Sequence, residues 1–472
     1  MENQALSKIA QWSHGRLLNA SPTAVVQGLT TDSRAVKQGD LFVALAGEKF
    51  DGHDFLLDVC AMGAAAAVVE ERRSAALPSN LPCIVVEDTR KALGAIAKAY
   101  RQLYSAAAIA IAGSNGKTST KELVASVLSQ RLRTLWSPAS FNNDIGVPLT
   151  ILQLTAAHQA GVFEVGTNHP GELRPLIEMI RPTIGIITSI GREHLEHFGT
   201  IDGVLEEEGT LAELLPAGEL LVINGDGYGA NQLTRRSIAR VLRVGHGKGN
   251  NWKIRVLEMG AAGSRFEVET DAKDYAGEYS IKLLGTHQVV NAAYAIVVGK
   301  ELGLGRADIQ RGLASCVGAK MRLQPKKIDD FIVLDDAYNA NADSMQAALD
   351  TLQVFPCRGR RIAILGDMGE LGETSVAAHE EVGRRAAEKG VDYLVAVGQK
   401  SRVMASAART AGLRNVLDLA EVEKVGPAVT EIVRSGDVVL VKASRSTRLE
   451  RVIEYLSDRY GAGQPSSSHS SS

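Results

Sequence analysis

Residues 109–118 read Ile-Ala-Ile-Ala-Gly-Ser-Asn-Gly-Lys-Thr, and they decide the expected fold. A short apolar run ends there in a glycine turn, and a helical pattern follows from Ser119 to Ser129. The order of strand, glycine-rich loop and helix is typical of a phosphate-binding loop in a parallel sheet. The segment therefore predicts an α/β domain that binds a nucleotide at this loop.

The loop residues suit phosphate for separate reasons. Gly113 and Gly116 allow the backbone to approach a polyphosphate and to point its N–H groups inward. Lys117 can reach the outer phosphates, and the Thr118 hydroxyl can bind magnesium. Two residues separate the glycines, fewer than in the common pattern, and Ile111 stands at the place of the usual first glycine. The alternative is a glycine-rich turn with a solvent-facing lysine, and we expect Lys117 to be exposed in the free loop.

Length and composition are those of an ordinary globular protein with several domains. The chain has 472 residues, of which 45% are hydrophobic and 22% charged, and its net charge is −2. This charge gives no basic field for nucleic acid, and no stretch is apolar enough to span a bilayer. The N-terminus has no apolar signal region, and the four cysteines are scattered without a CxxC pair. We expect a cytoplasmic protein with no nucleic-acid or membrane partner.

Strand and helix patterns divide the chain into three α/β domains. We predict a small N-terminal domain at 1–104, a central domain with a phosphate loop and a parallel sheet at 105–321, and a Rossmann-like C-terminal domain at 322–460. Three apolar runs without helices between them predict an antiparallel meander on the edge of the central sheet: 253–258, 265–269 and 279–283. The tail at 461–472 is nearly all Gly, Ser, Pro, Gln and His, and we expect it to be disordered.

Acidic and histidine side chains near the ends of the central strands are candidate metal ligands. Glu164 lies within an apolar strand, where a carboxylate needs an ion pair, a hydrogen bond or a metal. His194 follows the strand ending at Ile190 and is either a magnesium ligand or a cap or surface group. The acids Glu206–Glu208 are expected to open a helix, where acids complement the helix dipole without any further role.

Polar side chains also follow the apolar runs of the C-terminal domain. Asp335 and Asp336 come directly after a strand, and the segment 365–372 repeats this arrangement on the next one. Two cations and two hydroxyl groups in the segment 442–446 follow the last strand. That composition suits an anion better than it suits a core.

The chain resembles the Mur ligase family of ATP-dependent amide ligases from about Thr31 to Leu456. The parts common to that family are the loop Gly113–Thr118, the block from Gly285 to Asn291, and Arg322. Further segments resemble the family member that adds D-alanyl-D-alanine: 142–148, 168–172, 336–345, 365–372 and 442–448.

The resemblance implies a ligase of peptidoglycan precursor synthesis. In such enzymes a substrate carboxylate attacks the γ-phosphate of ATP to give an acyl phosphate. ADP leaves in that first step, and an amine then attacks the acyl phosphate and displaces phosphate to give the amide, so the site must neutralise charge and position the amine. The implied substrates are UDP-N-acetylmuramoyl-tripeptide and D-alanyl-D-alanine, and the implied cofactors are ATP and Mg²⁺. A monomer is expected.

The resemblance also assigns roles to individual residues. The implied ATP site comprises Gly113, Ser114, Asn115, Gly116, Lys117, Thr118 and Ser119, with Asn291 at the adenine and Arg322 and Asp336 from the third domain. Lys117 would bind the β- and γ-phosphates, while Thr118, Glu164 and His194 would hold magnesium. The implied substrate-binding residues are Ser33 and Arg34 at the uridine diphosphate, Asn143 in the sugar–peptide cleft, and Lys442, Ser444 and Arg445 near the ligated groups. Because two domains contact ATP, we expect domain closure to gate the reaction.

Two positions depart from the family pattern. Ala342 stands where the Asn-Ala-Asn motif usually continues with proline, which we expect only to loosen a turn. Mur ligases usually carry a carbamylated lysine in the helix after the magnesium histidine, and that position falls on Glu208. We expect the Glu208 carboxylate to replace it as a catalytic magnesium ligand, with Glu206 or Glu207 as alternatives.

Other functions stay open on the sequence. A nucleotide-binding scaffold that has lost ligation is favoured by Glu208 and disfavoured by the intact loop, Glu164 and His194. A folylpolyglutamate synthase or another Mur step is disfavoured by the uridine-site match at residues 33–34 together with the segments that resemble the member adding D-alanyl-D-alanine. A generic phosphate-loop kinase or motor is disfavoured by the shortened loop.

Overall fold

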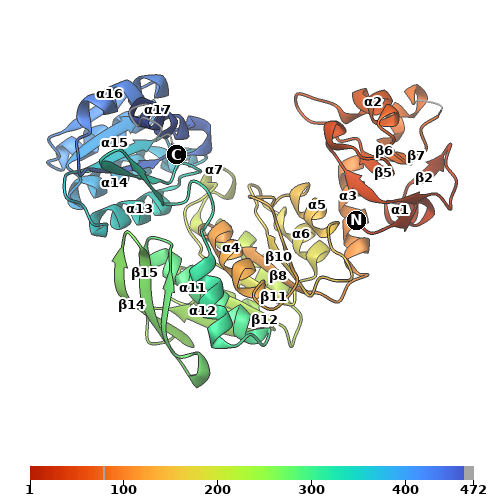
Figure 1. Cartoon of the computed structure of the whole chain (residues 1–472), viewed down its shortest axis with the longest axis horizontal. Helices are drawn as coiled ribbons and strands as arrows, with labels where there is room; N and C mark the ends of the chain where they lie inside the picture. Colours follow the sequence, from red (N-terminus) through yellow and green to blue (C-terminus); the bar gives the residue numbers. More distant parts are fainter. Residues whose placement is uncertain (78–79, 462–472) are drawn as a thin grey trace, which may run out of the picture.

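The computed structural model describes residues 1–77 and 80–461, which form three α/β units in a row (Figure 1). The N-terminal unit, red in Figure 1, and the C-terminal unit, blue, lie at opposite ends of the central unit. The predicted three-domain α/β fold class is confirmed. The tail expected to be disordered, beyond Gly461, lies outside the described residues. No helix within 1–77 and 80–461 is both long enough and apolar enough to cross a membrane.

The N-terminal unit is built on a small, mostly parallel sheet. Its described strands are ordered β2-β7-β6-β5-β4, and β2 runs antiparallel to β7. The strands are β1 (Gln4–Ala5), β2 (Arg16–Leu18), β3 (Val25–Val26), β4 (Gly28–Thr30), β5 (Asp40–Val43), β6 (Ala66–Glu70) and β7 (Cys83–Val86), and the helices are α1 (Leu6–Trp12), α2 (Leu56–Ala61) and α3 (Thr89–Arg101). The Asp88 side chain caps α3 by accepting from the N–H groups of Arg90 and Lys91, which fixes where this connecting helix begins.

The central unit is built on a larger sheet, which is packed against helices. Its described strands are ordered β16-β15-β14-β13-β12-β11-β8-β10-β9. They are β8 (Ala107–Ala112), β9 (Thr134–Trp136), β10 (Ala160–Glu164), β11 (Ile184–Ile187), β12 (Leu220–Asn224), β13 (Arg240–Gly245), β14 (Trp252–Gly260), β15 (Gly263–Thr270) and β16 (Gly277–Ile281). The helices are α4 (Lys117–Leu128), α5 (Gly146–Ile151), α6 (Leu173–Ile180), α7 (Leu195–Phe198), α8 (Ile201–Glu208), α9 (Thr210–Leu214), α10 (Ala230–Arg236), α11 (Thr286–Glu301) and α12 (Arg306–Ser315).

Strand register places the site at the carboxyl ends of the central strands of this sheet. The apolar strand β8 lies between the parallel strands β10 and β11, and it is buried because both of its faces are covered. Glu164 at the end of β10 is in register with Ile111, and Ile187 at the end of β11 is in register with Ala112. The chain that follows each of these strands therefore flanks the loop that follows β8.

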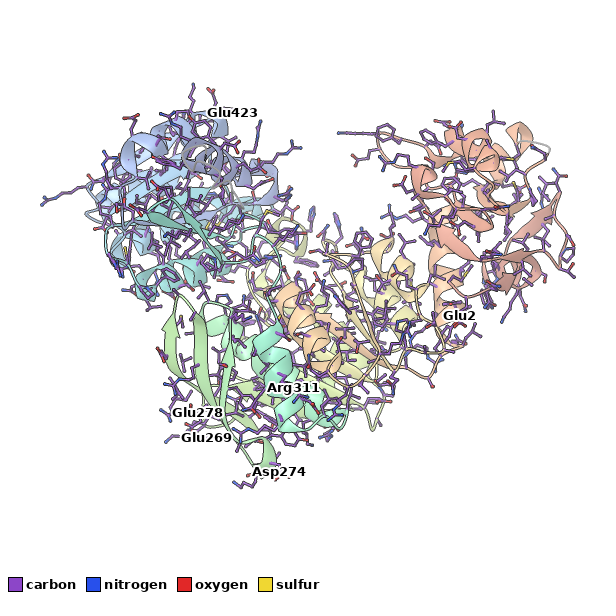
Figure 2. The ribbon with its side chains drawn as sticks, viewed as in Figure 1. Glu2, Glu269, Asp274, Glu278, Arg311 and Glu423 are labelled. Carbon is purple, nitrogen blue, oxygen red and sulfur yellow. The ribbon has the colours of Figure 1, made fainter. Side chains whose placement is uncertain are left out.

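The antiparallel meander predicted at the sheet edge is confirmed. Strands β14, β15 and β16 pair antiparallel, and they join the parallel part through β13. Their outward side chains form cross-strand ion pairs such as Lys253–Glu269 (2.7 Å) and Arg265–Glu278 (2.9 Å). Glu269 and Glu278 lie at the lower edge of the molecule, far from the other two units (Figure 2).

The C-terminal unit has its own, mostly parallel sheet. Its described strands are ordered β17-β18-β22-β19-β20-β21, and β17 runs antiparallel to β18. They are β17 (Gln324–Ile328), β18 (Phe331–Asp335), β19 (Arg361–Gly366), β20 (Tyr393–Val397), β21 (Val416–Leu419) and β22 (Val438–Lys442), and the helices are α13 (Ala342–Val354), α14 (Ser375–Glu388), α15 (Ser401–Thr410), α16 (Val425–Ile432) and α17 (Glu450–Gly461). Because β18, β22 and β19 are neighbours, the polar segments after them lie side by side.

The three acids Glu206–Glu208 do not open a helix, so that expectation is wrong. Helix α8 begins at Ile201, capped by the Thr200 side chain, and these acids end it, where the helix dipole disfavours negative charge. Tertiary partners compensate. Glu207 accepts from the N–H groups of Gly171 and Leu173 (both 2.8 Å) and so caps the start of α6 instead. The neighbouring Glu206 pairs with Arg236, and Glu208 contacts the phosphate loop.

Candidate active site

A cleft of about 1600 Å³ opens around the phosphate loop and is lined by residues from all three units. Most of the predicted site residues line it: Ser114, Asn115, Gly116, Lys117, Thr118, Ser119, Asn143, Glu164, His194, Asn291, Arg322, Asp336, Lys442, Ser444 and Arg445. Gly113, Glu208, Ser33 and Arg34 do not line it. The fold therefore brings the predicted nucleotide and ligation residues together and leaves the predicted uridine residues elsewhere.

The loop conformation requires both of its glycines. Gly113 has φ +114° and Gly116 has φ +90°, a region that side chains disfavour. A Cβ on Gly113 would stand 2.4 Å from Thr188 Oγ1, and one on Gly116 would stand 2.8 Å from Asn291 Oδ1. The loop is tied to the chain after β11, where the N–H groups of Ser114 and Asn115 donate to Ser189 O (2.8 Å) and Oγ (3.0 Å). Tight packing thus holds the loop in a shape that suits phosphate.

Lys117 is mostly buried, so the expected exposed side chain is wrong: only 14% of it is accessible. Its ammonium donates to the Gly113 carbonyl and lies 3.6 Å from Glu193 Oε2. Burial alone would lower the pKa of Lys117, but three carboxylates outweigh it and raise that pKa. In descending order of effect they belong to Glu193, Glu208 and Glu164. Lys117 is therefore a fixed cation that protein carboxylates neutralise when no phosphate is bound.

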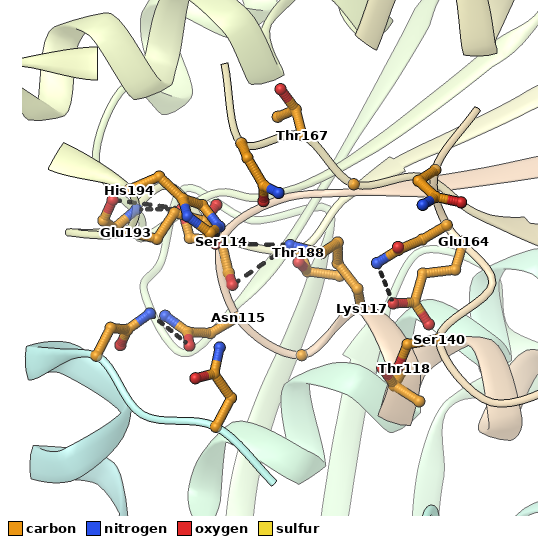
Figure 3. A pocket seen from close by; sticks show the side chains of 18 of the residues that line it. Ser114, Asn115, Lys117, Thr118, Ser140, Glu164, Thr167, Thr188, Glu193 and His194 are labelled. Carbon is orange, nitrogen blue, oxygen red and sulfur yellow. Dashed lines mark hydrogen bonds and ion pairs between the residues drawn. The ribbon is translucent and has the colours of Figure 1, made fainter. Parts of the chain in front are cut away.

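One carboxylate oxygen of Glu164 accepts a hydrogen bond, and the other has no hydrogen-bond partner in the described residues. Its Oε1 accepts from Asn142 Nδ2 (3.1 Å), and its buried Oε2 has no hydrogen-bond partner in the described residues. Figure 3 shows Glu164 near Thr118 on one side of Lys117, and Glu193 and His194 on the other side. A buried carboxylate oxygen without a donor is costly unless a cation or water meets it. The pair Glu164 and Thr118 therefore fits a magnesium ion.

This site is not a complete metal cage. In the described part of the chain, no three His, Cys, Asp or Glu side chains are arranged to hold a metal on their own. Magnesium at nucleotide sites commonly takes only one or two carboxylates, and phosphates and water complete the shell. Thr118 and Glu164 meet that requirement, whereas His194 stands across the loop from them.

His194 is fixed by a residue of the C-terminal unit. Its Nδ1 pairs with Glu370 Oε2, and its Nε2 lies 3.9 Å from Glu193 Oε2. The backbone of His194 is left-handed, with φ +47°. The ring thus reaches the cleft with Nδ1 already paired.

Glu208 lies behind the loop. Its Oε2 accepts from the Gly113 N–H (2.7 Å), and its Oε1 has no partner in the described residues. Burial raises the pKa of Glu208 to about 8, with Glu193 adding to the rise and Lys117 opposing it. A carboxyl in this place supports the loop and sits near Lys117.

The C-terminal unit supplies a buried ion pair to the cleft. Lys442 Nζ lies 2.7 Å from Asp336 Oδ2 and donates to the Asn339 carbonyl (2.9 Å). Burial lowers the pKa of Lys442, although Asp336 opposes that shift. The Arg322 guanidinium stacks 4.3 Å from the centre of the Tyr338 ring.

The neighbouring amides and hydroxyls are also held in place. Asn291 donates to Gln288 Oε1 (3.0 Å), and Gln288 donates to Ser119 Oγ (3.2 Å). In the C-terminal unit, Ser444 Oγ donates to the Asp367 carbonyl (2.8 Å), and Arg445 pairs with Glu450 (2.9 Å).

The predicted uridine residues form a local turn in the N-terminal unit. Asp32 accepts from the Arg34 N–H (3.0 Å) and pairs with its guanidinium (2.9 Å). These hydrogen bonds from Arg34 lower the pKa of Asp32 to about 2. Ser33 begins the short 3₁₀ helix that Asp32 caps.

Sequence reasoning missed several residues of this site. Asn142 contacts Glu164, and no role was predicted for it. Asn143, predicted for the sugar–peptide cleft, accepts from the N–H groups of Ile145 and Gly146 at the start of α5. Lys121 is fully buried and donates to the Ser137 carbonyl (2.7 Å), which fixes the segment that carries Asn142. The position of Lys121, one helical turn after Lys117, was the available signal. Glu193 adjoins His194 in the sequence and Glu370 lies in the segment 365–372, but neither was assigned a role.

Comparisons with known proteins show which family models, sequences and solved structures this chain is similar to. Family models match residues 25–101 (Mur ligase family, catalytic domain), 111–299 (Mur ligase middle domain) and 321–445 (Mur ligase, glutamate ligase domain). The UDP-N-acetylmuramoyl-tripeptide--D-alanyl-D-alanine ligase of Escherichia coli (strain K12) is 34% identical over 97% of this chain and 99% of its own. A crystal structure of MurF from Acinetobacter baumannii has a TM-score of 0.89 at 30% identity, covering 97% of this chain and 99% of that one. MurF ligase from Thermotoga maritima in complex with ADP has a TM-score of 0.81 at 26% identity, covering 92% and 98%.

Proposed function

The chain belongs to the Mur ligase family, and we propose that it joins D-alanyl-D-alanine to UDP-N-acetylmuramoyl-tripeptide in an ATP-dependent, ADP-forming reaction of peptidoglycan precursor synthesis. One observation carries this proposal. The phosphate-loop cleft is lined by all three units, in a chain similar to such ligases over nearly its whole length. The product bond is an amide between the tripeptide carboxyl and the dipeptide amine.

In this proposal the loop binds the phosphates of ATP. The N–H groups of Ser114 to Thr118 and the start of α4 attract the phosphate oxygens, and Asn291 lies at the adenine. Lys117 exchanges its protein carboxylates for the β- and γ-phosphates and offsets the charge that develops as the phosphoryl group moves to the substrate carboxylate. The resulting acyl phosphate must be protected from water until the amine arrives, which favours reaction in a closed cleft.

Magnesium is assigned to Thr118 and Glu164, with His194 and Glu208 as further ligands. The free oxygen of Glu164 supports the first pair. Glu208 also has a free oxygen, but it must turn from behind the loop to reach a cation. When bound, magnesium would neutralise phosphate charge and orient the transferred group.

The remaining residues are assigned to substrates. Ser33 and Arg34 would hold the uridine diphosphate, and Asn143 the sugar–peptide part. Arg322 and Asp336 would reach ATP from the C-terminal unit. The cations Lys442 and Arg445, with Ser444, would face the ligated groups, where they attract the negative acyl phosphate.

We assign residues 1–104, 105–321 and 322–460 to the UDP-substrate, ATP and ligase domains. A monomer in the cytoplasm fits the use of ATP and of a UDP-linked substrate. We propose no nucleic-acid or membrane partner.

The test is ADP release with each substrate omitted in turn. We expect sustained ADP release only when ATP, UDP-N-acetylmuramoyl-tripeptide and D-alanyl-D-alanine are all present, because without the amine the reaction stops after one ADP and one acyl phosphate per enzyme. Equal ADP release with folate and glutamate would favour a folylpolyglutamate synthase. Nucleotide binding without ADP release under any of these mixtures would favour a scaffold that has lost ligation.

A further inference from the structure

The segment after β11 is held by the C-terminal unit through Arg192. The Arg192 guanidinium donates to Asp343 Oδ1 (2.6 and 2.9 Å) and to Glu381 Oε2 (2.6 Å). The Arg192 N–H also donates to Asp343 Oδ2 (2.7 Å). These ion pairs dock the two units onto each other at the edge of the cleft.

A second contact, only two residues further on, reaches into the site. Glu370 Oε2 pairs with His194 Nδ1, and the Glu370 carbonyl accepts from the Glu196 N–H (3.1 Å). Glu370 therefore holds both the ring of His194 and the turn that follows it. Glu370 thus fixes the His194 ring itself, whereas Arg192 docks the two units and does not contact the ring.

Both partners of this contact have strained backbones. His194 has φ +47° and Glu370 has φ +57°. Residues other than glycine rarely adopt such conformations, and they keep them where the surroundings fix a functional geometry. Gly372, with φ +52°, lets the chain after Glu370 pass close to Glu196, since a Cβ there would stand 3.2 Å from Glu196 Cα. The chain is thus shaped on both sides of the interface to bring Glu370 onto His194.

The chemistry of this contact decides which nitrogen of His194 carries the proton. A carboxylate accepts hydrogen bonds, so Glu370 holds the imidazole proton on Nδ1 and leaves the Nε2 lone pair for a cation. Metal-binding histidines commonly donate their second ring N–H to a carboxylate, which fixes the ring and raises its basicity. Here that carboxylate comes from another unit of the protein.

We propose that Glu370 is a positioning residue that orients His194 for magnesium, so that seating of the C-terminal unit prepares the nucleotide site. The proposal rests on the proposed function, because it takes His194 as a ligand in an ATP site. It makes magnesium-dependent nucleotide binding depend on a residue of the far unit. A contact that served only to dock the units would leave the effect of magnesium unchanged.

The test is the dissociation constant of ADP, measured by calorimetry with saturating Mg²⁺ and with EDTA. We expect Glu370→Ala to weaken ADP binding about tenfold or more in Mg²⁺ and to change it less than about twofold in EDTA. In Glu370→Gln a neutral oxygen still accepts from Nδ1, so we expect a smaller loss than in Glu370→Ala. The Gln variant also serves if Glu370→Ala fails to fold.

Two controls separate positioning from general damage. Glu373→Ala removes a nearby exposed glutamate that makes no hydrogen bond or ion pair within the described chain, and we expect it to bind ADP like the wild type. His194→Ala should lose the magnesium effect by itself, and adding Glu370→Ala to it should cost less than about twofold more.

Two results would overturn the proposal while leaving the proposed function intact. One is wild-type magnesium dependence in Glu370→Ala. The other is full additivity of Glu370→Ala with His194→Ala. If magnesium has no effect on ADP binding by the wild type, His194 holds no magnesium beside ADP and this proposal fails, whereas the proposed function is still decided by the ADP-release test.

Discussion

The central unit meets its two neighbours through surfaces of opposite character. Toward the N-terminal unit it shares one continuous apolar core, in which Leu93 and Ile96 of α3 are buried together with Leu176 and Ile177 of α6. Toward the C-terminal unit the described contacts are mostly polar and include the two ion pairs of Arg192, with Leu284 as an apolar contribution from the central unit. The two core clusters of the C-terminal unit consist of residues 323–456 together with Leu284.

This difference separates a permanent joint from an adjustable one. Opening an apolar joint exposes buried surface to water at about 25 cal/mol per Å², whereas charged groups regain hydration when they separate. The N-terminal joint also carries hydrogen bonds such as Tyr100 Oη to Leu154 O (2.8 Å) and Arg101 Nε to Ile180 O (2.9 Å). We therefore expect the C-terminal unit to reorient during the reaction and the N-terminal joint to persist.

The largest expected effect lies on the polar side, at Lys117. Lys117→Ala should reduce turnover at least about a hundredfold, because one cation that stabilises developing charge in a dry site is worth several kcal/mol. Because the change leaves the Glu193 and Glu164 carboxylates without a buried cation, the variant should be less stable, and an unchanged far-ultraviolet circular dichroism spectrum at the assay temperature shows that it is still folded. ADP release is the measurement, and turnover above about a tenth of the wild-type value contradicts the assignment.

A substitution in the apolar joint should change the stability of the protein rather than its turnover. Ile96→Ala should lower the free energy of unfolding by about 2–5 kcal/mol, because it leaves a cavity in the shared core. Denaturant unfolding followed by circular dichroism measures this loss. Ile238→Ala is the matched control, since Ile238 is 71% exposed and should cost less than about 0.5 kcal/mol. Similar losses in both variants would remove the basis for calling this joint permanent.

A substitution at Glu208 tests whether this buried carboxyl binds a cation in the cleft or only supports the phosphate loop. If it reaches a cation in the cleft, as proposed, Glu208→Gln should lower turnover at least about tenfold and raise the magnesium concentration required. The amide keeps the size of the side chain and can still accept from the Gly113 N–H, so the loop should keep its shape. Turnover is measured against magnesium, with and without added bicarbonate. Unchanged magnesium dependence in the variant, or stimulation of the wild type by bicarbonate, would show that Glu208 only supports the loop.

Acid should weaken the polar side through His287. Burial lowers the pKa of His287 from 6.5 to about 4, against the opposing effect of Asp336. The unfolded chain takes up this proton near pH 6.5 and the folded chain only near pH 4, so the contribution of His287 to the free energy of unfolding falls as the pH is lowered through that window. Between pH 7 and pH 5.5 the wild type should therefore lose about 1 kcal/mol relative to His287→Gln, measured by denaturant unfolding of both proteins. Glu208, whose raised pKa acts in the opposite direction over this range, is present in both proteins and cancels in the difference. A constant difference between the two profiles would contradict the prediction.

The smallest effect on stability is expected for Arg192→Met. This variant should change the position of the C-terminal unit rather than the free energy of unfolding. Arg192→Met removes the ion pairs to Asp343 and Glu381 but should cost only about 1 kcal/mol or less, because these charges are partly exposed. Small-angle scattering should show a larger radius of gyration as the C-terminal unit loosens. Arg384→Met, which breaks only the local contact with Glu380, should leave the radius unchanged. A wild-type radius in Arg192→Met would mean that other contacts set the position of the unit.

The sequence by itself determined the local parts of this protein. The run at 109–118 predicted the strand β8, the phosphate loop and the helix α4, because each needs only neighbouring residues: an apolar strand, two glycines and a helical period. The meander of β14, β15 and β16 followed from short apolar runs without helices between them. The predicted phosphate and magnesium roles of Lys117 and Thr118 rest on the same local spacing and stay predictions.

Only the tertiary structure decided which polar groups meet. Glu208 contacts Gly113, 95 residues away, and His194 contacts Glu370, 176 residues away. Such pairs depend on the register of β8, β10 and β11 and on the docking of one unit against another, and neither leaves a local pattern. The same reason explains the failed expectations: Lys117 is buried because distant carboxylates surround it, and Glu207 caps a helix that lies earlier in the chain.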